Sequence, residues 1–465
     1  MEYQRKPFGG TCIREKNVAK KYTFSGGVHP SHSKNRTEKC VIEQFPAPPK
    51  VIIPLSQHIG GPAKPIVKRG DKVLIGQPVG EAGGFVSAPV HSSVSGTVLS
   101  VGLFNHPSGR QVTAVEIEND GLDQTLDFKS PVKAWRDAAP QELIQLISAA
   151  GIVGMGGAGF PTHVKLSPPS NKPIDTLIIN GAECEPYLTA DHSLMLERTE
   201  EFIEGVSILK KILGAKKCFI GIEENKPDAI KKVAGLLGEG FYRDFTLCTL
   251  IAKYPQGGEK QLINAVTGRE VPSGGLPMDV GCVVQNVGTT VAIHDAVVKG
   301  IPLFERVLTV TGAGVSAPKN LRVRIGTPIN TVLDYCAIDP KKVKKVIMGG
   351  PMMGLALSDV SVPVVKTTSG LLVLDSETPS LKTYPCINCG HCVHVCPINL
   401  IPSRIVKYVE KEDYEGAQEW NAMDCMECGS CAFVCPAKIN LVHWMKLGKY
   451  HIQALRRAAE AKKQG

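Results

Sequence analysis

The sequence has 465 residues, 43% hydrophobic and 21% charged, so it belongs neither to a disordered chain nor to a fibre. The 47 glycines and 33 prolines indicate many turns and short elements, and the length predicts about three domains. The net charge of +9 is concentrated in residues 1–50 and 438–465, whereas a nucleic-acid-binding protein usually carries its charge on a folded face. We therefore exclude nucleic acid as a partner.

Residues 1–44 are predicted to form a basic N-terminal extension. The first residues, MEYQRKPFGG, are charged and show no apolar segment, so we expect no signal peptide. Elsewhere the apolar runs are interrupted by glycine and proline, so we expect no transmembrane segment. Basic chain ends suit an anionic membrane surface or an acidic partner, and they suit solvated tails equally well.

Residues 45–125 contain short valine-rich runs separated by glycine turns, which predicts a small closed β domain. Residues 67–77, VKRGDKVLIGQ, resemble the hammerhead of biotinyl and lipoyl carrier domains, which implies a barrel-sandwich hybrid. Such carriers need a modifiable lysine at a hairpin tip. No lysine occurs between Lys72 and Lys129, so we expect a scaffold or docking domain without a swinging arm.

Residues 135–300 are predicted to form an α/β domain that contains the glycine-rich run 154–162, GMGGAGFPT. This run follows a helical pattern at 142–150 and is interrupted by Phe160-Pro161, so it is not an ordinary Rossmann turn. Its glycines allow backbone amides to approach an anion, and Lys165 follows as a cation, although a structural tight turn stays an alternative.

A βαβ unit follows, with a strand at 175–180, a helix at 193–213 and a strand at 217–222. Ligands of open α/β sheets bind at the carboxyl ends of strands. Polar residues cluster after these strands and in two later glycine-flanked turns: Asn180, Glu183, Glu185, Glu259, Lys260, Asn286 and Thr289. On their own, Glu183 and Glu185 also fit an exposed acidic loop. Residues 303–355 then show a strand–turn–strand–helix pattern and a further strand at 343–348.

Residues 375–445 contain two runs of the form C-x2-C-x2-C-x3-C-P. In this pattern three cysteines ligate one [4Fe–4S] cluster and the fourth ligates the other. We predict one cluster on Cys386, Cys389, Cys392 and Cys435, and a second on Cys425, Cys428, Cys431 and Cys396. Zinc sites use paired C-x2-C knuckles, which is not this pattern.

Helical patterns at 400–411 and 414–420 complete the helical dicluster fold of bacterial ferredoxins. Residues 446–465 are predicted to form a basic C-terminal helix with an irregular apolar face. This helix can lie on a membrane, cross a partner subunit or be a solvated terminal helix.

The segments GMGGAGFPTHVK, NGAECEP, QGGEK and NVGTT resemble the flavin-site segments of the NADH-oxidising flavoprotein subunit of respiratory complex I. The whole chain, including FSGGVHP at 24–30 and GGPMMG at 349–354, resembles the C subunit of the Rnf electron-transport complex more closely. This resemblance implies a multidomain α/β fold with a barrel-sandwich domain, an FMN/NADH-binding domain, a small β-grasp domain at 303–355 and a ferredoxin-like dicluster domain.

The resemblance also implies that FMN and then NAD(H) bind in the α/β domain and that the chemistry takes place on FMN, without a catalytic side chain. The amides of Gly154, Gly156 and Gly157, with Lys165, would hold the flavin phosphate side. The pocket for the flavin and the nicotinamide would be lined by Asn180, Glu183, Glu185, Glu259, Lys260, Asn286 and Thr289. Complex I has Asp at the position of Ala182 and Glu at that of Lys260, so these contacts differ here.

The function implied is a peripheral electron-transfer subunit, at the cytoplasmic face of the cell membrane, of an ion-translocating ferredoxin:NAD+ oxidoreductase. Its partners would be the other subunits of the complex, including an iron–sulfur subunit, with ferredoxin as an indirect electron donor. One alternative is a cobalamin reductase-like flavin and iron–sulfur protein, although those proteins place the barrel elsewhere in the chain. Another is a cluster-bearing scaffold without a working nucleotide site, which only Ala182 supports.

Overall fold

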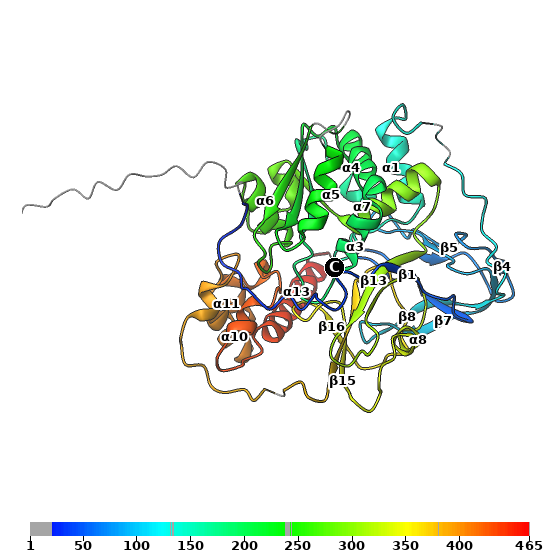
Figure 1. Ribbon diagram of the computed structural model, residues 1–465. Helices are drawn as coiled ribbons and strands as arrows, with labels where there is room; N and C mark the ends of the chain where they lie inside the picture. Colours follow the sequence, from blue (N-terminus) through cyan, green and yellow to red (C-terminus); the bar gives the residue numbers. More distant parts are fainter. Residues whose placement is uncertain are drawn as a thin grey trace, which may run out of the picture.

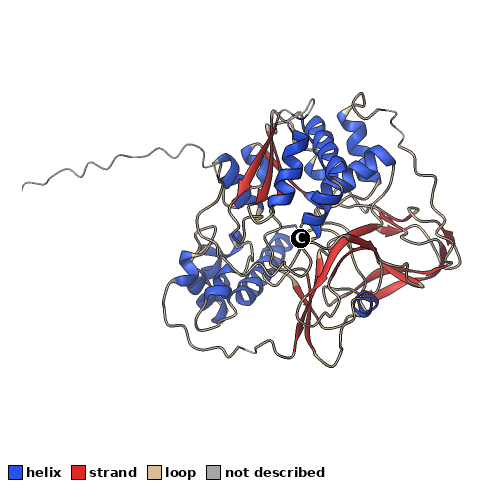
Figure 2. Cartoon of the chain, viewed as in Figure 1, coloured by secondary structure: helices blue, strands red, loops and turns tan. Residues whose placement is uncertain are grey.

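The computed structural model describes residues 21–464 apart from positions 131, 133, 238–241, 243 and 380. The first 20 residues of the predicted extension lie outside the described residues. Figures 1 and 2 show helices around a small sheet at the top, β-rich regions to the right and below, and a helical region at the lower left. In the part of the chain that the structure describes, no helix is both long and apolar enough to cross a membrane.

The barrel-sandwich region consists of two small antiparallel sheets with strand orders β2-β8-β7-β4 and β3-β5-β6. Val51 and Ile53 are fully buried on the same face of β2, because alternate residues of a strand point to the same side. The strands are β2 (Lys50–Pro54), β3 (Lys64–Pro65), β4 (Lys72–Val73), β5 (Pro78–Glu81), β6 (Val90–His91), β7 (Gly96–Asn105) and β8 (Gln111–Asn119).

The α/β region is built on a parallel four-stranded sheet in the order β11-β10-β9-β12. Its strands are β9 (Thr176–Gly181), β10 (Lys217–Glu223), β11 (Phe245–Leu250) and β12 (Cys282–Asn286). Its helices are α1 (Pro140–Ala149), α2 (Thr162–Lys165), α3 (Ala190–Glu197), α4 (Thr199–Leu213), α5 (Pro227–Leu237), α6 (Glu259–Thr267) and α7 (Val287–His294), with short turns η2 (Pro277–Val280) and η3 (Asp295–Lys299).

The strand order places a crevice between β9 and β12. The chain runs outward from β9 through β10 to β11 and then returns to the other side of β9 as β12. Such a reversal leaves the carboxyl ends of β9 and β12 open, which is where doubly wound sheets bind ligands. Asn180 and Asn286, which both come from the predicted site, are paired neighbours at this edge.

The helix predicted at 193–213 is two helices. Helix α3 ends at Glu197, and α4 begins at Thr199 after Arg198, whose φ of −128° and ψ of 41° are not helical. The Arg198 guanidinium donates two hydrogen bonds to Asp295, at 2.8 and 2.7 Å. Neither proline nor glycine marks this break in the sequence, so the sequence pattern did not reveal it.

A six-stranded mixed sheet, in the order β1-β14-β13-β17-β15-β16, forms the third region. It is larger than the predicted segment 303–355, because β1 joins it from residues 42–44 and β17 from residues 370–375. The elements are β1 (Ile42–Gln44), β13 (Glu305–Thr311), β14 (Lys319–Arg324), α8 (Ile329–Tyr335), β15 (Val343–Met348), β16 (Leu355–Leu357) and β17 (Gly370–Asp375).

The cysteine-rich region is helical, as expected. Its elements are α9 (His391–His394), α10 (Pro402–Glu410), α11 (Tyr414–Glu419), η4 (Ala422–Asp424), α12 (Ser430–Val434) and α13 (Leu441–Gln464). Met445 and Ile452 of α13 are buried against α10, together with Ile405 and Val409. The first half of the C-terminal helix is therefore part of the folded core, whereas Leu455 beyond it is exposed.

Candidate functional site

A cavity of about 580 Å³ opens at the crevice between β9 and β12. Its wall combines the glycine-rich run, the ends of these two strands, the start of α6 and the loop that follows β15. Eight of the predicted residues line it: Gly154, Gly156, Gly157, Lys165, Asn180, Glu185, Glu259 and Asn286. Glu183, Lys260 and Thr289 do not reach the cavity wall.

The glycine-rich run approaches the neighbouring chain closely. A Cβ atom at Gly156 would lie 3.0 Å from that of Asn286, so a side chain there would crowd the crevice. The Gly154 amide already donates to the carbonyl oxygen of Phe160 at 2.9 Å. Among the described residues, the amides of Gly156 and Gly157 have no partner, so these two remain available to an anion.

Lys165 and Glu259 form an ion pair in the cavity wall, with 2.7 Å between Nζ and Oε1. They come from α2 and the start of α6, which are far apart in the sequence. Both side chains are partly exposed, at 27% and 38%, so either one can exchange its partner for a bound ligand. The pair supplies one cation and one anion at the same edge of the cavity.

The two asparagines each fasten a neighbouring segment. Asn180 Nδ2 donates to the carbonyl oxygen of Gly257 at 2.8 Å, and its Oδ1 accepts from the Ala182 amide at 3.1 Å. Asn286 caps α7 by accepting from the Thr289 amide at 3.1 Å and donates to Asp191 Oδ2 at 2.6 Å. These bonds fix both side chains at the edge of the crevice.

Thr289 and Glu183 support the site from behind. Thr289 is fully buried, and its hydroxyl accepts from the Met155 amide at 2.9 Å, which anchors the glycine-rich run. Glu183 has a φ of 44°, and its carboxylate accepts from the amides of Asp191 and His192 at the start of α3, at 2.8 and 3.3 Å. Desolvation and the charge of Glu183 raise the pKa of Asp191.

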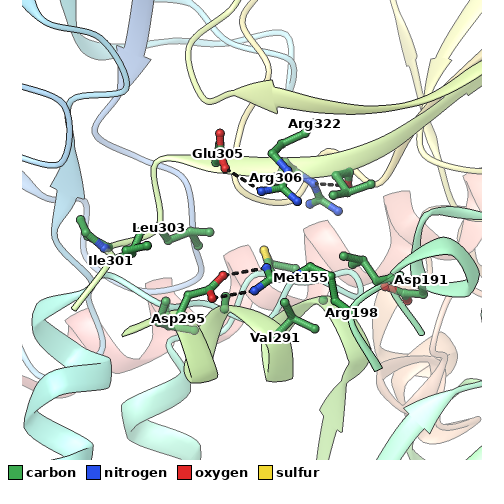
Figure 3. A pocket seen from close by; sticks show the side chains of 16 residues that line it. Met155, Asp191, Arg198, Val291, Asp295, Ile301, Leu303, Glu305, Arg306 and Arg322 are labelled. Carbon is green, nitrogen blue, oxygen red and sulfur yellow. Dashed lines mark hydrogen bonds and ion pairs between the residues drawn. The ribbon is translucent and has the colours of Figure 1, made fainter. Parts of the chain in front are cut away.

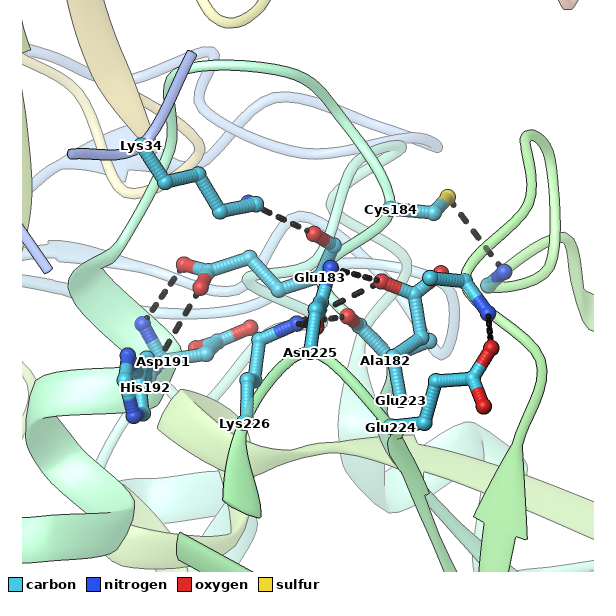
Figure 4. A network of polar contacts seen from close by, with 12 residues as sticks. Lys34, Ala182, Glu183, Cys184, Asp191, His192, Glu223, Glu224, Asn225 and Lys226 are labelled. Atoms are coloured by element: carbon cyan, nitrogen blue, oxygen red, sulfur yellow. Dashed lines mark hydrogen bonds and ion pairs between the residues drawn. The ribbon is translucent and has the colours of Figure 1, made fainter. Parts of the chain in front are cut away.

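Two buried lysines hold the loop that carries Glu183 and Glu185, as Figure 4 shows. Lys34 Nζ donates to the carbonyl oxygens of Glu183 and Glu185, at 2.9 and 3.0 Å, and also to that of Leu188. Lys226 Nζ donates to the carbonyl oxygen of Ala182 at 2.6 Å. These bonds hold the loop in place, and Glu183 and Glu185 are only partly exposed, which disagrees with the alternative of an exposed acidic loop.

Glu185 connects this loop to the region after β15. Its carboxylate accepts from the amides of Met352 and Met353, at 3.0 and 2.8 Å, and burial raises its pKa. A Cβ atom at Gly350 would lie 2.2 Å from Glu185 Oε2 and 2.8 Å from Glu185 Cβ, so a side chain there would displace the Glu185 side chain. Lys260, in contrast, points away from the cavity, and its Nζ donates to the carbonyl oxygen of Pro272 at 3.2 Å.

The first predicted set of cluster ligands lines one cavity. Cys386, Cys389, Cys392 and Cys435 all border a space of about 110 Å³, so this donor set fits a four-cysteine cluster. Cys386 and Cys389 are exposed, whereas Cys392 and Cys435 are buried. We call these four residues the far set.

The second predicted set is more deeply enclosed. Burial, together with the charge of Cys428, raises the pKa of Cys425 to about 11. Burial also raises the pKa of Cys431, and the charges of Cys425, Cys428 and Cys396 act in the same direction. The four thiols therefore lie within electrostatic range of one another, and we call them the near set.

The near set adjoins the large cavity. Met426, between Cys425 and Cys428, is part of the cavity wall, and Tyr254 Oη donates to the carbonyl oxygen of Cys428 at 2.6 Å. The far set has no residue in that wall. The order from the cavity outward is thus near set, then far set, then the surface.

Sequence reasoning missed Gln285 and Met426. Gln285 is 2% exposed and lines the cavity, and among the described residues its Nε2 atom has no hydrogen-bond partner. A buried donor without a partner is costly, so this amide fits a ligand that supplies an acceptor. Gln285 directly precedes the predicted Asn286, and this adjacency was the only feature of the sequence that could have placed Gln285 in the site.

A smaller cavity of about 80 Å³ lies between α7 and the strands β13 and β14, as Figure 3 shows. Arg198 pairs with Asp295 at 2.7 Å, and Arg322 pairs with Glu305 at 3.4 Å. These charges largely satisfy one another, and none of the predicted site residues borders the space. We regard it as the packed junction between the α/β region and the mixed sheet.

Three family models match successive parts of the chain. Residues 22–122 match the RnfC barrel sandwich hybrid domain, residues 147–295 the Nuo51 FMN-binding domain, and residues 378–436 the 4Fe–4S dicluster domain. The fold and these matches define an electron-transfer flavoprotein with two iron–sulfur clusters, which confirms the predicted fold class and the FMN and [4Fe–4S] cofactors.

The similarity to curated proteins extends over nearly the whole chain. The C subunit of the proton-translocating ferredoxin:NAD(+) oxidoreductase complex of Clostridium ljungdahlii is 47% identical, over 95% of this chain and 96% of that protein. The C subunit of the Na(+)-translocating complex of Acetobacterium woodii is 48% identical, over 94% and 98%. The C subunit of the ion-translocating oxidoreductase complex of Pseudomonas aeruginosa is 44% identical, over 94% and 56%. The chain belongs to this family, the C subunits of Rnf-type complexes, as the sequence motifs predicted.

Proposed function

We propose that this chain is the subunit of an ion-translocating ferredoxin:NAD+ oxidoreductase that exchanges electrons between NAD(H) and two [4Fe–4S] clusters through FMN. The observation that carries this proposal is the contact between the cavity and the near set, since Met426, which lies between the near-set residues Cys425 and Cys428, is part of the cavity wall. Flavin converts two-electron hydride chemistry into one-electron transfers, which is the conversion that a nicotinamide and an iron–sulfur cluster require.

The cavity residues then bind and orient. The amides of Gly156 and Gly157 and the Lys165 ammonium would hold the flavin phosphate, because they present positive charge and free donors to one edge of the cavity. Gln285 Nε2 would donate to an acceptor on the bound group. Asn180, Glu185, Glu259 and Asn286 would complete the wall, while Glu183 and Thr289 hold its elements in place.

Electrons would pass between the cavity and the near set, and then between the near set and the far set. The far set has two exposed cysteines and would therefore exchange electrons with a partner. Residues 378–409 and 428–459, which include seven of the eight ligand cysteines, contain no Asp or Glu but contain Lys382, Lys407 and Lys438. A partner with an acidic surface suits this basic face.

That partner would be another subunit of the complex, which carries an iron–sulfur centre and receives electrons from ferredoxin. The chain would be peripheral, at the cytoplasmic face of the membrane. The relatives named for H+ and for Na+ translocation are 47% and 48% identical to this chain, so its sequence does not favour one ion over the other.

An anaerobic absorption spectrum before and after NADH addition tests this proposal. We expect about eight irons per chain, from two four-iron clusters, together with flavin absorption that NADH bleaches. Clusters that NADH reduces only when flavin is present would support the order given above. A protein with one or two zinc ions and no labile sulfide would contradict the proposal.

A further inference from the structure

The N-terminal strap, residues 22–34, contacts the sheet of the α/β region, a chain segment of the near set and the loop that carries Glu185. It contains the FSGGVHP motif, to which the proposed function gives no role. At its start Tyr22 pairs with Leu250 of β11. Val28 then exchanges two backbone hydrogen bonds with Tyr254, at 2.8 and 2.9 Å. The strap is thereby fastened to the α/β region.

The two glycines of the strap lie against the near set. The Gly27 amide donates to the carbonyl oxygen of Val395 at 2.8 Å, next to the ligand Cys396. A Cβ atom at Gly26 would lie 2.9 Å from the carbonyl oxygen of Cys396, and one at Gly27 would lie 2.6 Å from that of Tyr254. Both glycines have a φ of +79°, so conformation and close approach both require glycine here.

Tyr254 extends the same contact to the second ligand loop. Its ring is 1% exposed and packs in one apolar cluster with Val28, Met426 and Cys428. Its hydroxyl donates to the carbonyl oxygen of Cys428. The strap and Tyr254 thus hold both chain segments that carry the near set.

The other end of the strap holds the cavity wall. Lys34 is 6% exposed and donates to the carbonyl oxygens of Glu183 and Glu185, and Glu185 lines the cavity. Burial lowers the pKa of Lys34 to about 8, while the charge of Glu183 opposes this shift. One short segment is therefore bonded to the loop that carries Glu185 through Lys34, and to a ligand segment of the near set through Gly27.

We infer that the strap is a positioning element that fixes the distance between the cavity and the near set. The inference rests on the proposed function, because it requires a cofactor in the cavity and a cluster on the near set. Electron transfer between two centres slows steeply as their separation grows. Displacement of the strap should therefore slow this one transfer and leave the reaction of NADH in the cavity unchanged.

The test compares Gly27→Ala and Tyr254→Phe with the parent and with a control, Gly235→Ala. Gly235 lies in α5, and a Cβ atom added there meets nothing within 4 Å. Each anaerobic protein is mixed rapidly with NADH, which delivers two electrons to the flavin, and each cluster then accepts one. Flavin bleaching and cluster reduction are followed as separate phases. The iron content and the cluster midpoint potentials are measured in parallel.

We expect Gly27→Ala to bleach its flavin at the parent rate and to reduce the near cluster several-fold more slowly, with unchanged iron content and potentials. Tyr254→Phe, which keeps the packing and loses one hydrogen bond, should show a smaller slowing of the same phase. If Gly27→Ala loses iron, the inference is tested by the rate of near-cluster reduction in Tyr254→Phe. Cluster reduction at the parent rate, or slowing that a shifted potential explains, would overturn the inference. Flavin that NADH never bleaches in the parent would instead reject the proposed function.

Discussion

The two cysteine runs have the same spacing, yet they lie in different surroundings. In the far set Cys386 and Cys389 are exposed, and a Cβ atom at Gly390 would meet nothing within 4 Å. In the near set Cys396, Cys428 and Cys431 are buried, and a Cβ atom at Gly429 would lie 2.9 Å from the carbonyl oxygen of Met352. The same ligand pattern therefore specifies two clusters, while the packing around each determines what the cluster can exchange electrons with.

The largest expected effect comes from removing one ligand of each set. Cys428→Ser and Cys386→Ser should each lower the iron content from about eight to about four per chain. Cys428→Ser should also prevent NADH from reducing the far cluster, because the near cluster lies between the flavin and the far cluster. Cys386→Ser should leave the near cluster reducible. Electron paramagnetic resonance after NADH addition distinguishes these results, and far-cluster reduction at the parent rate in Cys428→Ser would contradict the order.

The next effect concerns the cavity itself. Lys165→Ala removes the cation that faces Glu259 and should weaken FMN binding by about 1.5–3 kcal/mol, the range for a hydrogen bond to a charged group. NADH-dependent dye reduction should be lost at low FMN and partly recovered at high FMN, with unchanged iron content. The control is Lys231→Ala, on an exposed face of α5. Normal FMN affinity in Lys165→Ala would show that the phosphate binds elsewhere.

Glu185 gives an intermediate effect that depends on pH. Burial raises its pKa, so its contribution to the free energy of unfolding is fully present below the unfolded value of 4.5 and is lost as pH rises through the folded value. Glu185→Ala leaves the amides of Met352 and Met353 without their acceptor, which should loosen the loop after β15 and strongly reduce dye reduction.

Glu185→Gln keeps one acceptor oxygen and has no charge to titrate. It should therefore retain more activity than Glu185→Ala and abolish the part of the stability–pH profile that this carboxyl causes. Thermal unfolding between about pH 4 and 8 measures this. If the two variants lose activity equally, Glu185 acts by its charge rather than by holding the loop.

The smallest expected effect concerns the exposed face of the far set. Lys382→Glu and Lys407→Glu should slow electron exchange with a redox partner that has an acidic surface, and added salt should reduce the difference from the parent. Reduction of an uncharged dye should not change. Lys231→Glu serves as the control on a distant basic position. Slowing that is independent of salt would contradict an electrostatic docking face.

The sequence predicted the parts of the site that depend on short spacing. Both proposed cluster ligand sets are predicted from cysteine spacing. Lys165, Asn180 and Asn286, which line the cavity, are predicted from glycine turns and strand ends. The sequence did not show which of two nearby residues in a turn would line the cavity. Glu183 and Glu185 are two residues apart, but the φ of 44° at Glu183 turns its carboxylate to α3, while Glu185 lines the cavity.

Contacts between distant segments were beyond prediction. Met426 lines the cavity only because the cysteine-rich region packs against the 254–261 segment, through bonds such as Tyr254 to Cys428 and Gln261 to Pro397. The folded chain likewise creates the ion pair of Lys165 with Glu259. It also creates the hydrogen bonds from Lys34 to the 183–188 loop. No periodicity or spacing encodes such pairs.

The central claim is that electrons leave the cavity through the near set before they reach the far set. Rapid freezing of the anaerobic protein at successive times after NADH addition, with electron paramagnetic resonance of each sample, tests it directly. We predict that the signal missing from Cys428→Ser appears before the signal missing from Cys386→Ser. Appearance in the reverse order, or of both without flavin reduction, would contradict the account.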